Sequence, residues 1–284
     1  MKFLVMGASG MAGHQIAIYL KEQGHDVVGF VRKKVDFVDS IEGDATDLEF
    51  VREVVRLGNY DAVINAVGIL NQDAEIHKER AVLLNAYLPH YLAEITKDLS
   101  TQIVHMSTDC VFSGKKGNYT ENSLRDGETF YDRSKALGEL EDNKNITFRN
   151  SIIGPDINQN GIGLLNWFMK QNGTINGYTG AMWTGLTTLQ LAKVIERAVQ
   201  QKATGLYNMV PNRNISKYDL LNLFNRYLRN QALNIEKYDA FRCDKTLIRT
   251  RFEFAEVMPD YETMIQEMAE WMRNHKALYP HYGL

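Results

Sequence analysis

Short apolar runs alternate with longer stretches of helical periodicity through the first 151 residues. The apolar runs lie at 2–6, 26–31, 61–67, 102–107 and 146–151. The helical stretches lie at 11–23, 48–57 and 74–97, and a further helix is expected around Tyr131. Strands that are apolar throughout are typical of a parallel sheet buried on both faces. The alternation therefore predicts an α/β fold with a doubly wound parallel sheet.

The alternation loosens after residue 151. Glycine-rich loops, "NGIG" and "NGYTG", are expected to alternate with amphipathic helices near 188–201, 216–229 and 261–274. We expect an N-terminal α/β domain over 1–151 and a smaller lobe mainly over 152–284. Some segments of that lobe, at about 183–205, are expected to pack back on the first domain.

Composition and charge narrow the class of protein. Of the 284 residues, 44% are hydrophobic and 24% are charged, as in ordinary globular proteins. The net charge of −3 predicts no general affinity for nucleic acid or for an anionic membrane. The apolar run at 2–6 is too short for a signal segment or a membrane span. Cys110 and Cys243 form neither a metal-ligand spacing nor a disulfide framework, which predicts a reducing cytoplasmic location.

A glycine loop follows the first predicted strand. In "MGASGMAGH", Gly7, Gly10 and Gly13 have the spacing Gly-x-x-Gly-x-x-Gly. Between a strand and a helix, such a loop lets the backbone approach a pyrophosphate and directs N–H groups toward it. A tight turn that needs glycine for backbone reasons alone is the alternative. The position at the first strand–helix junction favours a dinucleotide-binding domain over 1–151.

The end of the second predicted strand bears on which dinucleotide binds. An NAD-selective fold of this type usually has an acidic residue there, which binds the ribose 2′-hydroxyl. This chain has Arg32, Lys33 and Lys34 instead. Arg32 could bind a 2′-phosphate in bidentate fashion, whereas a solvated basic loop is the alternative. The sequence favours NADPH, with NADH as the second choice.

A tyrosine and a lysine four residues apart are the candidate catalytic pair. In "YDRSK", Tyr131 and Lys135 share one helix face. A nearby ammonium favours the phenolate, so we expect a lowered phenol pKa and a proton donor for ketone reduction. Ser107 and Thr108 end a strand at the sheet edge where such folds bind ligands, and a hydroxyl there could orient the substrate oxygen. Taken alone, these hydroxyls are also typical of a strand end capped by its own side chains.

Together these motifs resemble the extended short-chain dehydrogenase/reductases. The glycine loop, "NAVG" (65–68), "STDCVFSG" (107–114) and "YDRSK" (131–135) carry the resemblance. More narrowly, they are similar to the dTDP-4-dehydrorhamnose reductase group. The resemblance implies NADPH-dependent reduction of the 4-keto group of a nucleotide-diphospho-6-deoxysugar, in the synthesis of cell-surface polysaccharide precursors. It also includes "GDATD" (43–47), "RNSIIG" (149–154) and the segments 183–199 and 205–221.

The resemblance also implies roles for individual residues. The catalytic threonine, tyrosine and lysine of the family match Thr108, Tyr131 and Lys135. Its cofactor-contacting positions match Gly7, Ser9, Gly10, Met11, Arg32, Asp44, Ala45, Ala66 and Gly68, together with Tyr131 and Lys135. Its sugar-nucleotide cleft matches segments that contain Arg149, Asn150 and Trp183, with Thr108 and Cys110 beside the sugar.

One position departs from the family pattern. Cys110 stands where the family usually has tyrosine, and its smaller side chain leaves room for another sugar substituent, such as an N-acetyl group. No histidine pair has zinc-ligand spacing, so no metal is expected, and His105 in an apolar strand is expected to be a core residue.

Two other functions stay open at this point. One is an NAD-dependent epimerase or dehydratase of the same superfamily, and the other is a non-catalytic NADP-binding regulatory subunit. A homodimer is compatible with the sequence but is not required by it.

Overall fold

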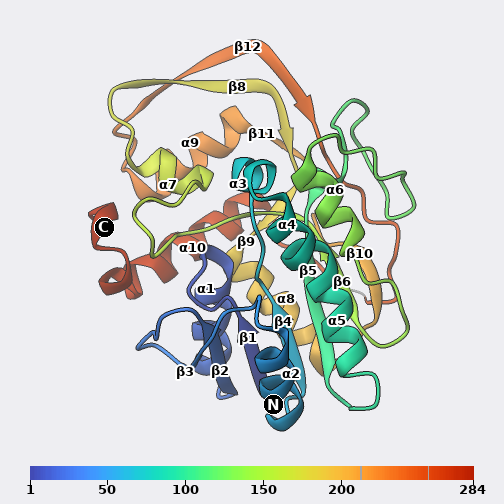
Figure 1. Ribbon diagram of the computed structural model, residues 1–284. Helices are drawn as coiled ribbons and strands as arrows, with labels where there is room; N and C mark the ends of the chain where they lie inside the picture. Colours follow the sequence, from blue (N-terminus) through green and yellow to red (C-terminus); the bar gives the residue numbers. More distant parts are fainter. Residues whose placement is uncertain (212, 255) are drawn as a thin grey trace.

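Seven parallel strands form the central sheet of the computed structural model, which describes residues 1–211, 213–254 and 256–284. In sheet order they are β10 (Gly205–Asn208), β6 (Ile146–Arg149), β5 (Gln102–Ser107), β4 (Ala62–Asn65), β1 (Lys2–Met6), β2 (Asp26–Val31) and β3 (Asp39–Glu42). The chain runs from β1 toward β3 and then returns to β4 on the other side of β1 (Figure 1). The doubly wound fold is thereby confirmed, and ligands bind such sheets at the carboxyl ends of the strands beside this reversal.

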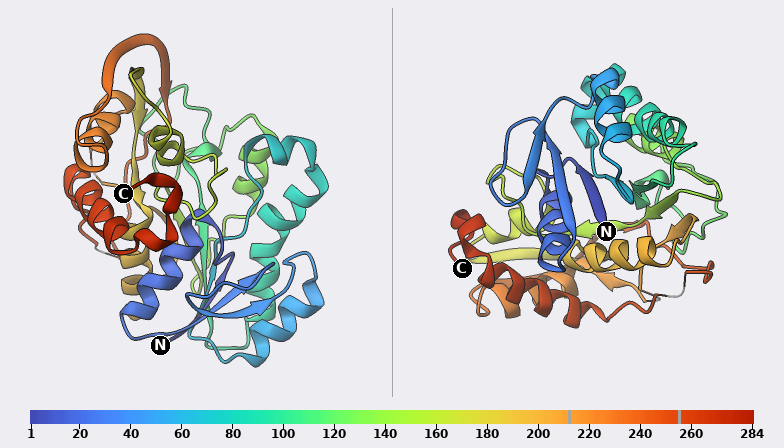
Figure 2. Two further views of the ribbon diagram at one scale, coloured as in Figure 1. Left: turned by 90° about the vertical axis from the view of Figure 1, so that its left-hand side faces the viewer. Right: turned by 90° about the horizontal axis from the view of Figure 1, so that it is seen from below.

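Helices cover both faces of the sheet (Figure 2). The helices on one side are α1 (Met11–Glu22), α8 (Thr188–Gln200) and α10 (Tyr261–Asn274), and those on the other are α2 (Leu48–Leu57) and α5 (Leu88–Ile95). Strand β1 is apolar at successive positions because both of its faces are buried. Phe3 and Val5 join the core on the α1 side, whereas Leu4 and Met6 join the core on the α2 side.

The helix expected over 74–97 is broken into four pieces. They are α3 (Asn71–Ile76), α4 (Lys78–Ala81), the π-helical turn η1 (Val82–Tyr87) and α5. Pro89 lies in the first turn of α5 and has no N–H to continue the ladder. In the π-helical turn, Asn85 is fully buried and bonds both the N–H and the carbonyl of Ile69. The break therefore serves to hold the loop that follows β4.

The C-terminal part adds a smaller sheet and an extended arm. That sheet has the order β11 (Ile215–Ser216), β8 (Thr174–Trp183) and β12 (Asn234–Asp244), and it lies beside α7 (Leu164–Met169) and α9 (Lys217–Leu228). Strands β8 and β12 form an arch at the top of Figure 1. A second pair joins β7 (Ser151–Ile153) to β9 (Gly185–Thr187). The loop expected at "NGYTG" is wrong, because these residues lie within β8. Strands β8 and β12 were not predicted because their residues are mostly polar or glycine, so the apolar signal is absent.

The two parts of the chain share one layer. Helix α8 packs on α1, and β10 extends the central sheet beside β6. Residues of the later half thus complete the N-terminal sheet, and the boundary at residue 151 stays a prediction. No helix in the described part of the chain is both long and apolar enough to cross a membrane.

Candidate active site

The glycine loop joins β1 to α1 in a tight turn. Gly7 has a φ of +80°, and its carbonyl accepts a bond from the N–H of Gly10 at 2.9 Å. A Cβ on Gly13 would lie 2.1 Å from the Gly7 oxygen, so only glycine fits there. Gly10 caps α1 without a side-chain bond, and the first turn of that helix contains no acidic residue. An N-terminus of this kind fits a pyrophosphate.

The cofactor-contacting residues predicted after β2 and β3 come close together. Asp44 accepts bonds from the N–H and hydroxyl of Thr46, both at 2.9 Å, and these bonds hold the pKa of its carboxyl below the ordinary value. The positive charges of Arg80 and Arg32 add to that lowering of the Asp44 pKa. Ala45 is buried beside them. Arg80, on α4 (Lys78–Ala81), is a charged neighbour of Asp44 that sequence reasoning missed.

The carboxyl ends of three neighbouring strands carry the remaining predicted residues. Strands β1, β4 and β5 are adjacent and parallel, so Gly7, Ala66 and Thr108 emerge at one edge of the sheet. Gly68 lies on the loop after β4, where a Cβ would be 3.1 Å from the Asn85 side chain. Sequence reasoning did not find Asn85, because an asparagine in a helical stretch carries no distinctive signal.

Thr108 and Tyr131 lie together above that edge. Thr108 precedes the short helix η2 (Asp109–Val111), and its Oγ1 accepts a bond from the N–H of Cys110 at 3.1 Å. Tyr131 is in the first turn of α6 (Phe130–Leu137), whose N-terminus is held by a capping box between Thr129 and Asp132. Tyr131 is only 7% exposed and packs against Ala74, Ala81 and Cys110.

The expected lowering of the Tyr131 pKa is wrong. Burial raises the pKa of the phenol, Cys110 adds to the rise, and the Thr108 hydroxyl opposes it. Lys135 does not lower it, because its Nζ is directed to the sheet and donates to the carbonyl of Met106 at 2.7 Å. The phenol is therefore fully protonated near neutral pH, which still suits a proton donor.

Lys135 is a buried cation at the end of β5. Burial lowers its pKa to about 8, and the carboxylate of Glu139 opposes this shift. Its Nζ also lies 3.5 Å from Nε2 of His105, a fully buried side chain that Asn65 approaches at 3.3 Å. An ammonium has three donors, so one remains for a ligand. His105 is a core residue, as its strand predicted.

Arg149 is not available to a substrate, contrary to our expectation. It is fully buried, and its Nε and Nη2 donate to the two carboxylate oxygens of Glu139 at 2.8 and 2.7 Å. Ser107 donates to the same carboxylate at 2.6 Å, and Arg125 also pairs with it. The last residue of a strand can be directed to either face of the sheet, and Arg149, which ends β6, is directed to the face that carries Glu139. Ser107 likewise belongs to this cluster and not to the catalytic group.

Asn150 and Trp183 are buried but incompletely bonded. They are 3% and 4% exposed, and Asn150 Nδ2 and Trp183 Nε1 lack a hydrogen-bond partner within the described residues. Trp183 packs on Tyr261, and Nζ of Lys217 lies 5.4 Å from the centre of its indole ring. Their contact with a substrate stays a prediction.

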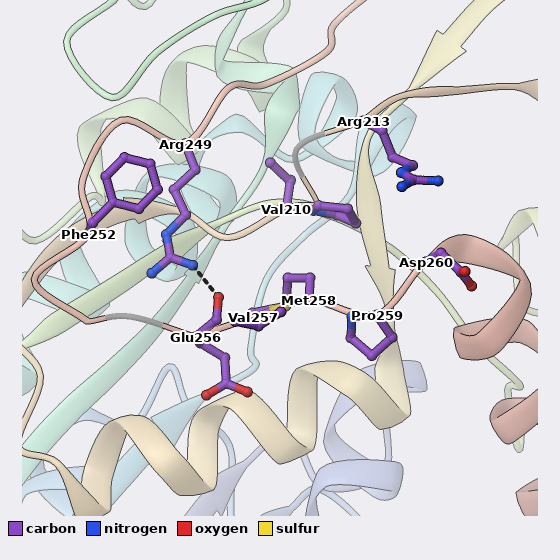
Figure 3. A pocket seen from close by; sticks show the side chains of 10 residues that line it. Val210, Arg213, Arg249, Phe252, Glu256, Val257, Met258, Pro259 and Asp260 are labelled. Carbon is purple, nitrogen blue, oxygen red and sulfur yellow. Dashed lines mark hydrogen bonds between the residues drawn. The ribbon is translucent and has the colours of Figure 1, made fainter.

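A cavity elsewhere in the C-terminal part contains none of the predicted residues. It has a volume of about 360 Å³, and its wall includes Arg213, Arg249 and Asp260 (Figure 3). The Arg249 guanidinium donates to the carbonyl of Glu256 at 2.6 Å and to that of Phe254. This arginine holds its own loop together, so the cavity is not the candidate site. In the described residues, no group of three or more His, Cys, Asp or Glu is placed to hold a metal ion.

Comparison with known proteins agrees with this geometry. The family model described as "RmlD substrate binding domain" matches residues 1–251. The chain belongs to this family. Among its relatives, the spore coat polysaccharide biosynthesis protein SpsK of Bacillus subtilis is 33% identical over 142 residues, which is 49% of this chain and 47% of that protein. The probable low-salt glycan biosynthesis reductase Agl14 of Haloferax volcanii is 35% identical over 139 residues, 48% of this chain and 46% of the relative. The match thus spans about half the length of each relative.

Solved structures of the family share the whole fold. The dTDP-4-dehydrorhamnose reductase of Bacillus anthracis, in complex with NADP, superimposes with a TM-score of 0.79 at 20% identity. The alignment covers 94% of this chain and 98% of that one. The corresponding reductase of Clostridium acetobutylicum has a TM-score of 0.79 at 21% identity, with 96% and 100% of the chains covered. At these identities the likeness establishes the fold.

Proposed function

We propose that this protein reduces the 4-keto group of a nucleotide-diphospho-6-deoxysugar with NADPH. The observation that carries the proposal is the pairing of a buried, protonated Tyr131 with Thr108 at the sheet edge that also presents the glycine loop. The names of its relatives, which include a dTDP-4-keto-6-deoxy-D-glucose reductase and a polysaccharide biosynthesis protein, support it. A role in polysaccharide precursor synthesis and a cytoplasmic location are part of the same proposal.

The residues of this chain would act as follows. Thr108 donates a hydrogen bond to the substrate carbonyl oxygen, and Tyr131 transfers its phenolic proton to that oxygen as the carbon is reduced. Bound NADPH supplies the hydride. Lys135 would use its remaining donor on the nicotinamide ribose. Water then returns a proton to Tyr131.

The residues fit this cofactor in two places. The N-terminus of α1, which has no side-chain cap, would hold the pyrophosphate, and Arg32 after β2 would offer a cation for a 2′-phosphate. The second place favours NADPH over NADH. Arg80 on α4 adds a second positive charge that acts on Asp44, beside the Arg32 that the sequence offered.

Cys110 supports a sugar other than rhamnose. It packs against Tyr131, and burial raises its pKa to about 12, so it is a small neutral thiol at neutral pH. A substituent on the sugar, such as an N-acetyl group, would fill the space that an aromatic ring would otherwise occupy.

The test is NADPH oxidation with a panel of nucleotide-linked 4-keto-6-deoxysugars. The panel includes dTDP-4-dehydrorhamnose and a UDP-linked 2-acetamido analogue, and NADH is run in parallel. We expect turnover with one member, a preference for NADPH, and loss of at least about a hundredfold in kcat for Tyr131→Phe. Thr108→Val should lower kcat less, with cofactor binding retained in both variants.

Two results would overturn the proposal. The first is full activity of Tyr131→Phe. The second is silence across the panel from protein that binds NADPH, together with a stoichiometric enzyme partner in a pull-down, which would favour a regulatory subunit.

A further inference from the structure

The C-terminal tail (275–284), red in Figure 2, contacts both ends of α1. At the last residue of that helix, Nε2 of His275 lies 2.7 Å from Oε1 of Glu22. In its first turn, Nε2 of His14 lies 2.6 Å from the hydroxyl of Tyr279. His14 is fully buried, and Tyr279 is only 1% exposed. These two side chains are 265 positions apart in the sequence, so only the fold brings them together.

The partners of His14 determine which of its ring nitrogens carries the hydrogen. Nδ1 lies 2.9 Å from the carbonyl oxygen of Gly10, which can only accept, so Nδ1 carries the hydrogen and donates. Burial lowers the pKa of His14 to about 4, so the ring is neutral and Nε2 is bare. The Tyr279 hydroxyl, whose pKa is raised by burial, therefore donates to Nε2. In the other tautomer, a bare Nδ1 would face the Gly10 oxygen with its lone pair.

The bond to Gly10 sets the direction of a backbone N–H in the glycine loop. The Gly10 carbonyl accepts from both the backbone N–H and Nδ1 of His14, at 3.0 and 2.9 Å. The peptide between Gly10 and Met11 is planar and trans, so the N–H of Met11 points opposite to that carbonyl, out of the helix. An N–H at this position has no acceptor within its helix and is available to a pyrophosphate. The His14 ring thus orients one donor of the cofactor site.

The tail also contacts the loop that packs on Met11. Tyr282 stacks on Tyr279, with ring centres 5.8 Å apart, and its hydroxyl accepts a bond from the N–H of Asp156 at 2.9 Å. Asp156 begins a loop that ends at Gly163, where a Cβ would lie 3.1 Å from the sulfur of Met11. The tail therefore contacts both segments that meet at Met11.

We propose that His14 and Tyr279 are positioning residues for the dinucleotide. The Tyr279 hydroxyl holds the His14 tautomer that orients the Gly10–Met11 peptide toward the pyrophosphate, which makes the C-terminal tail part of the cofactor site. The inference rests on the cofactor of the proposed function and not on the identity of the sugar. A role in packing alone would need the aromatic ring of Tyr279 but not its hydroxyl.

The experiment is fluorescence titration of the full-length protein with NADPH, for the wild type and for Tyr279→Phe. This change keeps the ring and removes one hydroxyl, so Nε2 of His14 loses its donor and the other tautomer becomes accessible. We expect the Kd for NADPH to rise by roughly tenfold. Tyr238→Phe removes a hydroxyl from an exposed tyrosine on β12 and is the matched control, with no change expected.

A second variant tests whether Tyr279 acts through His14. In His14→Asn the side-chain amide can donate to the Gly10 carbonyl in place of Nδ1, and it has no tautomer for Tyr279 to select. Adding His14→Asn to Tyr279→Phe should therefore restore most of the lost NADPH affinity. Nitrogen NMR of the histidine side chains should show the Nδ1–H tautomer for His14 in the wild type and a mixture of tautomers in Tyr279→Phe.

Hydrogen exchange provides a test on the unmodified protein. If the tail orients a donor of the cofactor site, bound NADPH must stabilise the tail by the same coupling free energy. Saturating NADPH should therefore slow amide exchange severalfold at Leu278, Tyr279 and Tyr282, whose N–H groups are bonded within the tail.

Three results would overturn the inference. One is an unchanged Kd for NADPH in Tyr279→Phe. Another is an equal loss of affinity from Tyr279→Phe in the His14→Asn background, which would show that the hydroxyl acts by another route. The third is tail exchange that NADPH does not alter. Each measurement concerns NADPH binding alone, so silence across the sugar panel would count against the proposed function and leave this inference standing.

Discussion

Two clusters of buried charge lie beside the end of β5, and they are built in opposite ways. In the paired cluster (Ser107, Arg125, Glu139 and Arg149), the Glu139 carboxylate is bonded by a hydroxyl and two guanidinium groups. In the unpaired cluster (Asp109, Lys217 and Lys245), neither lysine forms an ion pair with any residue that the structure describes. Ser107 and Asp109 are only two residues apart.

The difference separates residues that hold the fold from residues that are available to a ligand. A buried charge whose bonds are all made within the chain has nothing left for a substrate, and removing one partner leaves the other charge buried alone. A half-buried cation without a partner keeps its donors free, and such groups are typical of binding sites. Arg149 and Lys217 are both basic residues near the end of β5, but only Arg149 forms an ion pair within the residues that the structure describes.

The largest effect is expected from breaking the paired cluster. Arg149→Met should lower the free energy of unfolding by about 3–5 kcal/mol, because Glu139 would remain as a buried carboxylate without its bidentate partner. Guanidinium denaturation measures the change. Adding Glu139→Leu should recover much of the loss, since an apolar pair needs no desolvation of charge. Arg226→Met removes an exposed ion pair with Glu262 and serves as the control. If Arg149→Met cost no more than this control, the paired cluster would not be structural.

A smaller effect is expected from pH on NADPH affinity. Glu139 of the paired cluster also acts on Lys135, because its negative charge raises the pKa of that lysine. Burial lowers the pKa of Lys135 to about 8, so its ammonium is present below that pH and is lost above it. NADPH affinity, measured by fluorescence titration, should therefore fall severalfold between about pH 7 and pH 9. Glu139→Gln removes the charge that raises the Lys135 pKa, and the midpoint should move to lower pH. Lys135→Arg stays charged and should flatten the profile; an unchanged slope in that variant would contradict the assignment.

The smallest effect on stability is expected from the unpaired cluster. Lys217→Met and Lys245→Met should each change the free energy of unfolding by less than about 1 kcal/mol, because no ion pair is broken and a desolvated cation is removed. The same denaturation experiment measures it. A loss comparable to that of Arg149→Met would make these lysines structural and would remove the contrast between the two clusters.

The order of elements and the residues on single strand–helix junctions were predictable from the sequence. The apolar run of β1 and the spacing of Gly7, Gly10 and Gly13 are local patterns, because each depends on the geometry of one strand, one turn and one helix. Helices α2 and α10 lie where their periodicity placed them. Thr108 and Tyr131 came from motifs of the same local kind, and the structure brings both to one edge of the sheet.

Other features depended on packing between distant segments. The sequence predicted a lowered pKa for Tyr131 because Lys135 is four residues away, but burial and the Met106 carbonyl decide where the phenol and the ammonium lie. The motif "RNSIIG" predicted that Arg149 would line the substrate cleft. In the structure, Arg149 is directed to the other face of the sheet and pairs with Glu139. A short-range pattern states which residues are neighbours along one element. It does not state what desolvates them.

The sequence by itself determined the order of the strands and helices in the N-terminal part and predicted the class of chemistry, because the glycine turn, the hydroxyl and the phenol lie at fixed places along neighbouring elements. Only the tertiary structure decided which charged side chains form ion pairs within the protein and which do not. Lys217 and Lys245 reach Asp109 through α9 and β12, more than a hundred residues away along the chain. Desolvation and ion pairing are set by everything that packs around a group, and no local pattern encodes that surrounding.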